Sequence, residues 1–258
     1  MRRTPLLPAP ELLVATLMAI ITVGPNAGFA QEVRAPLTEA QAQCFGNDSD
    51  AKIAGCNAII SDITASDKVR SGAYNNRGIA NSRIKKIALA LADYTESIRL
   101  DQTNAKAFSN RGLLYIDLGK IDEGFSDFSE AIRIDSEVTR FYYLRANLNV
   151  SKKDYASALA DYNSAIKLDP ADEFAWGNRG EVQLILGHFE QAYADFVMAT
   201  HLKSGNANNL YGRGVAAFKL GRRTEALADT EAALKLDPAI AESYVKDGIP
   251  DPRLPRQP

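Results

Sequence analysis

A strict 34-residue periodicity constrains this chain more than any other feature. The tripeptide Asn-Arg-Gly stands at 76–78, 110–112 and 178–180, and arginine recurs at that step five times. Aspartate and a small residue recur at the same step in two further series. The arginines are Arg77, Arg111, Arg145, Arg179 and Arg213, and the aspartates are Asp93, Asp127, Asp161, Asp195 and Asp229. Repeats of constant length predict a stack of similar structural units.

Each unit holds two amphipathic helical patterns around a short break. Leu118-Gly119-Lys120 is one such break, and proline in Leu-Asp-Pro at 168–170 and 236–238 ends a second helix because it cannot continue one. The predicted fold is all-α, a solenoid of antiparallel helix pairs over 71–238. Its five units lie at approximately 71–104, 105–138, 139–172, 173–206 and 207–240, and are called units 1 to 5 below.

The units resemble the tetratricopeptide repeat (TPR) family. The fourth shows the pattern best, with an aromatic residue, a small residue, an alanine, a second aromatic and a second alanine. These are Trp176, Gly180, Ala192, Phe196 and Ala199. The fifth unit departs, since Leu210 and Thr230 replace the aromatics. The resemblance implies a right-handed superhelical solenoid whose first helices line a concave groove.

The amino end has the composition of a targeting segment. Arg2 and Arg3 precede the 12-residue apolar stretch 12–23, which is too short to span a bilayer. Small residues near Ala30 predict cleavage after it, so residues 1–30 are expected to be a signal peptide. We therefore expect an exported bacterial TPR protein, periplasmic or secreted, with no membrane span after cleavage. A glutamate just before the apolar stretch leaves open that the segment is retained as an anchor.

Both cysteines fall in a degenerate unit that precedes the repeats. Extending the register back by one unit places Cys44 and Cys56 in slots eight and twenty, which hold small residues elsewhere. In an exported chain this predicts a disulfide that staples a helical hairpin over 31–70 as an amino-terminal cap. A redox-active or metal-binding pair is the alternative. At the other end, 239–248 is expected to be a capping helix and 249–258 a proline-rich flexible tail.

The arginine and aspartate series occupy slots seven and twenty-three of each unit. In an antiparallel pair these slots lie close together, which predicts a structural ion pair within each unit or with its neighbour. A ligand-binding ladder of arginines is the alternative. The same counting places Gly112 opposite Gly124 and Phe108 opposite Phe128.

The inventory of chemical groups argues against an enzyme. There is no phosphate-binding loop, dinucleotide fingerprint, nucleophile elbow or metalloprotease helix. The two histidines, His188 and His201, are expected to be exposed and apart. A formal net charge of −2 lacks the basic excess typical of nucleic-acid binding. We therefore expect no catalysis, no cofactor, no metal and no nucleic-acid partner.

The predicted function is that of an adaptor binding a protein segment, either a peptide or a partner helix, in the concave groove. The alternative is a structural component of an envelope complex that self-assembles as a homo-oligomer. The basic carboxylate clamp of some chaperone-binding relatives is missing. Candidate groove residues are Asn75, Asn110, Leu113, Tyr143, Asn147, Phe174, Asn178 and Tyr211. It remains open whether some of them only pack between neighbouring units.

Overall fold

The computed structural model describes residues 35–246, and every regular element in that range is an α-helix. The predicted signal peptide and the tail over 249–258 lie outside the described residues. The described helices are α1 (Ala35–Phe45), α2 (Ser49–Ser61), α3 (Asp67–Arg83), α4 (Ile87–Leu100), α5 (Ala105–Asp117), α6 (Ile121–Ile134), α7 (Thr139–Ser151), α8 (Tyr155–Leu168), α9 (Glu173–Ile185), α10 (Phe189–Leu202), α11 (Ala207–Lys219), α12 (Arg223–Leu236) and α13 (Ile240–Lys246).

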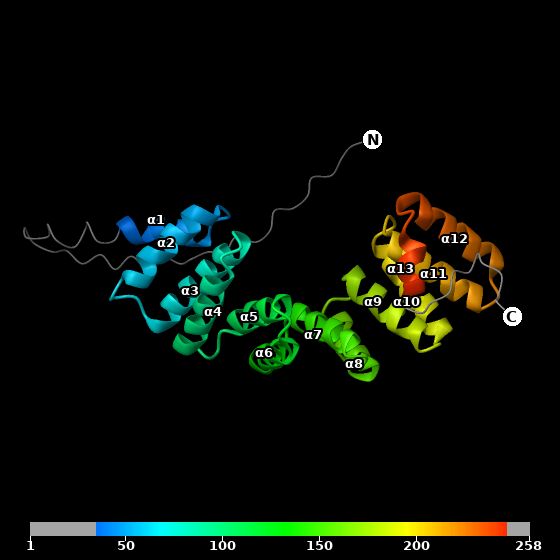
Figure 1. Cartoon of the computed structure of the whole chain (residues 1–258), viewed down its shortest axis with the longest axis horizontal. Helices are drawn as coiled ribbons and strands as arrows, with labels where there is room; N and C mark the ends of the chain where they lie inside the picture. The colour runs from blue at the N-terminus through cyan, green and yellow to red at the C-terminus, as the bar shows by residue number, and fades with distance from the viewer. Residues whose placement is uncertain (1–34, 247–258) are drawn as a thin grey trace, which may run out of the picture.

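The helices pair along the chain, from α1 with α2 to α11 with α12, and the pairs stack in sequence order, with α13 after the last pair (Figure 1). The two helices of a pair are antiparallel: Ser71 of α3 contacts Ser97 late in α4, whereas Arg77 contacts Asp93 earlier in α4. The fold class is therefore the predicted all-α solenoid. Among the described helices, none has both the length and the apolar character needed to cross a membrane.

A left-handed residue follows the first helix of every unit. Gly119, Gly187 and Gly221 have φ between +74° and +81°, and Lys85 and Lys153 hold the same slot at +62° and +60°. Glycine adopts this conformation freely because it has no Cβ, whereas a lysine there costs about 1 kcal/mol. The turn reverses the chain so tightly that the second helix packs at once against the first.

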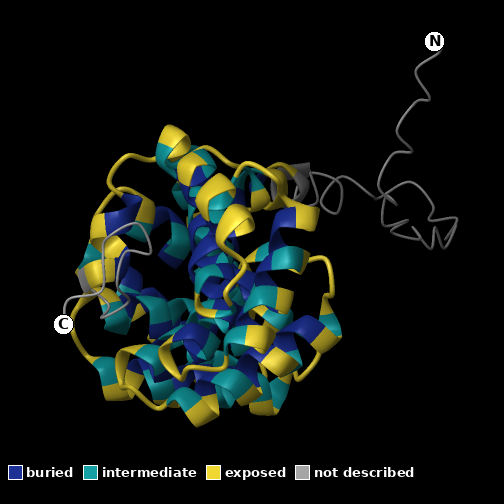
Figure 2. Cartoon of the chain, turned by 90° about the vertical axis from the view of Figure 1, so that its right-hand side faces the viewer, coloured by how far each residue is buried: buried dark blue, intermediate teal, exposed yellow. Residues whose placement is uncertain are grey.

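Small residues let the two helices of a unit approach each other. A Cβ added to Gly124 would lie 3.0 Å from the carbonyl oxygen of Gly112, so the predicted contact of these glycines is present. The expectation for Phe108 and Phe128 is wrong: Phe128 packs over Gly112, whereas Phe108 packs with residues of α5, α6 and α7. The ring of Phe128 occupies the space that the missing Cβ of Gly112 leaves. The buried residues lie on the sides of the helices that face other helices (Figure 2).

The last described helix, α13, packs against α11. Tyr244 of α13 packs against Tyr211 of α11 with ring centroids 4.8 Å apart. Its hydroxyl also donates to the backbone carbonyl of Asn208 at 2.9 Å. These contacts place α13 beside the first helix of unit 5.

Candidate functional site

All five arginines of the repeat form an ion pair with the aspartate sixteen residues later, in the same unit. Each arginine is largely buried and each aspartate is more deeply buried than its partner. The Nη2–Oδ1 distances are 2.6 Å for Arg77–Asp93, 2.8 Å for Arg111–Asp127, 2.7 Å for Arg145–Asp161, 2.6 Å for Arg179–Asp195 and 2.6 Å for Arg213–Asp229. Hydrogen bonding to Asp161 raises the pKa of Arg145, whereas burial raises the pKa of Asp195.

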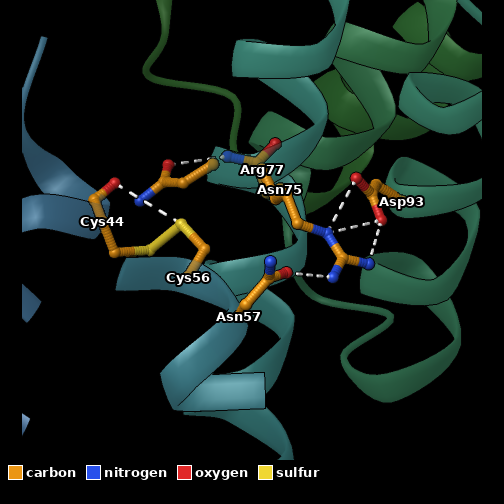
Figure 3. Close-up of a disulfide and its surroundings, with 7 residues drawn as sticks. Cys44, Cys56, Asn57, Asn75, Arg77 and Asp93 are labelled. Carbon is orange, nitrogen blue, oxygen red and sulfur yellow. Dashed lines mark hydrogen bonds and ion pairs between the residues drawn. A yellow bond between two sulfur atoms is a disulfide. The ribbon is translucent and has the colours of Figure 1, made fainter. Parts of the chain in front are cut away.

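The third guanidinium nitrogen reaches the preceding helix pair in four of these cases. Each such arginine therefore joins two neighbouring units as well as the two helices of its own unit. The Nη1 bonds are Arg77 to Asn57 (2.6 Å, Figure 3), Arg145 to Ser129 (3.2 Å), Arg179 to Asn163 (2.6 Å) and Arg213 to Thr200 (2.8 Å). In these four arginines, hydrogen-bond donors of all three guanidinium nitrogens are used inside the stack.

The disulfide between Cys44 and Cys56 is confirmed (Figure 3). It joins α1 to α2 across a Cα–Cα distance of 4.6 Å, and both residues are fully buried. Bonded to each other, the sulfurs are not available as metal ligands. Among residues 35–246 there is no cluster of three side chains able to hold a metal ion. His188 and His201 are both exposed, and His188 Nδ1 lies 2.7 Å from Gln183.

Two of the predicted groove residues are buried and do not line an open surface. Tyr211 is 0% exposed because Tyr244 of α13 covers its ring. Asn75 is 6% exposed and accepts a hydrogen bond from Asn110 of the next unit at 2.9 Å. The prediction that Tyr211 and Asn75 line the groove is therefore wrong, because other residues of the stack cover both side chains. Leu113 is half-buried.

Asn110 lies in α5, and the four remaining predicted residues lie where α7 meets α9. Phe174 is 48% exposed, and Tyr143, Asn147 and Asn178 are half-buried. Asn178 Nδ2 donates to the Tyr143 hydroxyl at 3.1 Å and to Asn147 Oδ1 at 3.2 Å. These bonds bring four of the eight sequence candidates into one surface, at the junction of units 3 and 4.

Two hollows flank the bond between Asn178 and Tyr143. The larger, of about 560 Å³, lies toward the carboxyl ends of α7 and α9. Its lining residues are Asn147, Val150, Ser151, Lys153, Tyr155, Tyr162, Asn178, Glu181, Val182 and Ile185. The smaller, of about 470 Å³, lies at their amino ends. Its lining residues are Thr139, Arg140, Tyr143, Asp169, Asp172 and Phe174.

The floor of the larger hollow contains a tyrosine that the sequence analysis did not select. Tyr162 of α8 is nearly fully buried, and its hydroxyl donates to Asn147 Oδ1 at 2.5 Å. Burial raises the pKa of Tyr162, so its hydroxyl stays protonated. Units 2 and 4 have Phe128 and Phe196 in this slot. Unit 1 has a tyrosine there as well, Tyr94, so the residue type in this slot did not single out unit 3 in the sequence.

Part of this polar network stays available for a ligand. Among residues 35–246, the Nδ2 of Asn147 and the Oδ1 of Asn178 have no hydrogen-bond partner, although both side chains line the larger hollow. One group is a donor and the other an acceptor, so together they match the carbonyl and the N–H of a peptide backbone. The site therefore combines exposed aromatic rings with a fixed donor and acceptor.

These features define a solenoid of helical repeats with two hollows between α7 and α9. Residues 109–173 and 207–240 match the tetratricopeptide repeat family, so these parts of the chain are tetratricopeptide repeats. Comparison with curated proteins gives no match.

Solved structures share the fold. YrrB, described as a TPR protein with an unusual peptide-binding site, aligns at a TM-score of 0.59 and 24% identity, covering 67% of this chain and 91% of its own. A MamA protein aligns at a TM-score of 0.59 and 20% identity, covering 73% of this chain and 98% of its own. A MamA RS-1 double mutant aligns at a TM-score of 0.60 and 15% identity, covering 66% of this chain and 95% of its own. At these identities the likeness establishes the fold alone.

Proposed function

We propose that this protein is a non-enzymatic adaptor that binds an extended protein segment across the junction of α7 and α9. The observation that carries the proposal is the polar network between the two hollows, with its unused donor on Asn147 and acceptor on Asn178. A helical ligand has already paired most of its backbone groups, whereas an extended segment offers free ones. The network therefore favours a peptide over a partner helix.

The walls of the smaller hollow supply apolar contact. Phe174 and Tyr143 present aromatic rings, and such rings anchor many protein interfaces. The concave surface thus combines anchors for side chains with polar groups for a backbone, as peptide-binding sites do. The description of YrrB as having a peptide-binding site is consistent with this use of the fold.

We also propose that the protein is exported. A buried disulfide is typical of proteins that fold in an oxidising compartment. The charged start and the short apolar stretch of the sequence support the same assignment. Mass spectrometry of the protein from its native host would show a first residue after Ala30, and an intact amino terminus would contradict cleavage.

The proposed groove can be tested without knowing the natural partner. Linear peptides are selected from a displayed random library on the wild-type protein, and their affinities are measured by fluorescence anisotropy. The double variant Tyr143→Ala/Phe174→Ala should bind the selected peptides about tenfold more weakly, because exposed aromatic anchors dominate such interfaces.

The matched control is Phe45→Ala, which removes an aromatic ring that is 69% exposed at the end of α1. It should leave peptide affinity unchanged. If the selected peptides bind the double variant as tightly as the wild type, the groove at α7 and α9 is not the binding site.

A further inference from the structure

The last described helix is connected by hydrogen bonds to the edge of the larger hollow. Helix α13 ends at Lys246, and the Tyr244 hydroxyl binds the backbone of Asn208. The Asn208 side chain in turn donates to Glu181, which lines the larger hollow. Consecutive hydrogen bonds thus connect the last helix to the edge of the site.

The segment that follows Lys246 is long enough to cross both hollows. Residues 247–258 number 12, and an extended chain of polyproline type rises about 3.1 Å per residue, so the segment spans about 37 Å. Packed helices lie about 8–10 Å apart, so the path from α11 past α9 to α7 is about 20 Å. Arg253 and Arg256, the seventh and tenth residues of the segment, are both within reach of the site.

The composition of the segment matches the surface of the hollows. Four of its 12 residues are proline, which favours an extended backbone and lowers the entropy lost on binding. The amino-terminal part of the segment carries two aspartates, Asp247 and Asp251, and its two arginines, Arg253 and Arg256, lie in its last seven residues. The hollows are lined by three carboxylates, Asp169, Asp172 and Glu181, against two cations, Arg140 and Lys153. Aromatic rings beside carboxylates suit the stretch 252–258, in which each arginine directly follows a proline.

We propose that residues 247–258 are an intramolecular ligand of the hollows between α7 and α9 and compete there with partner peptides. The inference deepens the proposed function, on which it rests, by naming an occupant of the same site. A ligand tethered this closely acts at an effective concentration near millimolar. Weak contacts therefore suffice to occupy the groove until a better segment displaces them.

A photo-cross-linking experiment on the full chain tests the occupant. The photoreactive residue p-benzoylphenylalanine is placed at position 174 in one protein and at position 45 in the other, and cross-linked peptides are identified by mass spectrometry. Position 174 should cross-link to residues 247–258 within one molecule, independently of protein concentration, and position 45 should not. Absence of that cross-link, or cross-linking only between molecules at high concentration, overturns the proposal.

A second experiment measures the competition. The double variant Arg253→Gln/Arg256→Gln should bind library-selected peptides about fivefold more tightly, because two surface ion pairs of the competing segment are lost. The control Arg99→Gln/Arg133→Gln removes the same charge from two exposed pairs on second helices and should change nothing. Unchanged affinity in the first variant overturns the intramolecular ligand. It leaves the groove intact if Tyr143→Ala/Phe174→Ala still weakens binding.

Discussion

The amino-terminal hairpin and the repeat units hold two antiparallel helices together by different means. In unit 3 the pair Arg145–Asp161 joins α7 to α8 and Arg145 also reaches α6. In the hairpin the corresponding slots hold Gln43 and Ile59, and the Cys44–Cys56 disulfide joins α1 to α2 instead. The same helical geometry is thus fixed by charge in one region and by a covalent bond in the other.

The difference follows from the number of neighbours. A unit inside the stack buries its faces against units on both sides, so its arginine can bind the preceding unit as well as its own aspartate. The described hairpin packs onto α3 alone, and its buried cluster consists of Ala40, the two cysteines, Ile59 and Ala73. A short hairpin with one neighbour buries little apolar surface, and the disulfide compensates by restricting its unfolded state.

The largest expected effect is the loss of a repeat ion pair. Arg145→Ala leaves Asp161 buried without its cation, which should lower the free energy of unfolding by about 3–5 kcal/mol. The control Arg133→Ala removes a pair in which the arginine is 69% exposed and should cost under about 1 kcal/mol. Urea denaturation followed by circular dichroism measures both. Equal effects of the two variants would show that burial does not govern these pairs.

Removing the disulfide should destabilise the hairpin alone. The double variant Cys44→Ala/Cys56→Ala reopens a loop of 12 residues, which costs about 3 kcal/mol on the chain-entropy model. Hydrogen exchange read by mass spectrometry should show faster exchange in α1 and α2, with α7 to α10 unchanged. Faster exchange throughout the stack would mean that the hairpin stabilises every repeat and is more than a local cap.

Alkaline pH should affect the first repeat through Tyr94. Burial, with a contribution from the charge of Asp93, raises the pKa of Tyr94 to about 12. The unfolded tyrosine loses its proton at about pH 10, so stability falls as the pH rises from about 10 to 12, by at most about 2–3 kcal/mol. Tyr94→Phe, the residue that unit 2 uses in this slot, should flatten that slope in denaturation measured across this pH range. An unchanged slope would exclude Tyr94 as its source.

The smallest expected effect concerns the turn after α3. Lys85→Gly should stabilise the chain by about 0.5–1 kcal/mol, because glycine adopts φ of +62° without strain. The neighbouring Lys86 has φ of −83°, and Lys86→Gly should destabilise instead. Thermal unfolding compares the two. Lys85→Gly should raise the thermal unfolding midpoint of the repeats and leave hydrogen exchange in α1 unchanged. A lower midpoint would contradict the prediction.

The sequence predicted contacts within a unit better than contacts between units. The disulfide and the proximity of slots seven and twenty-three depend only on the register of two antiparallel helices, which a fixed repeat specifies. The burial of Tyr211 depends on α13, and the burial of Asn75 depends on Asn110 of unit 2. Helical phase identifies the side of a helix that faces away from its own partner. It does not show whether a neighbouring unit covers that side.

The sequence by itself therefore determined the period, the helix pairs, the disulfide and the residues of the ion pairs, because each of these repeats or falls at a fixed register. Only the tertiary structure decided where the hollows between neighbouring units lie. The hollows beside Tyr143 depend on the buried hydroxyl of Tyr162 and on how closely α9 approaches α7. That approach is set by the sizes of many side chains acting together, which no single spacing in the sequence encodes.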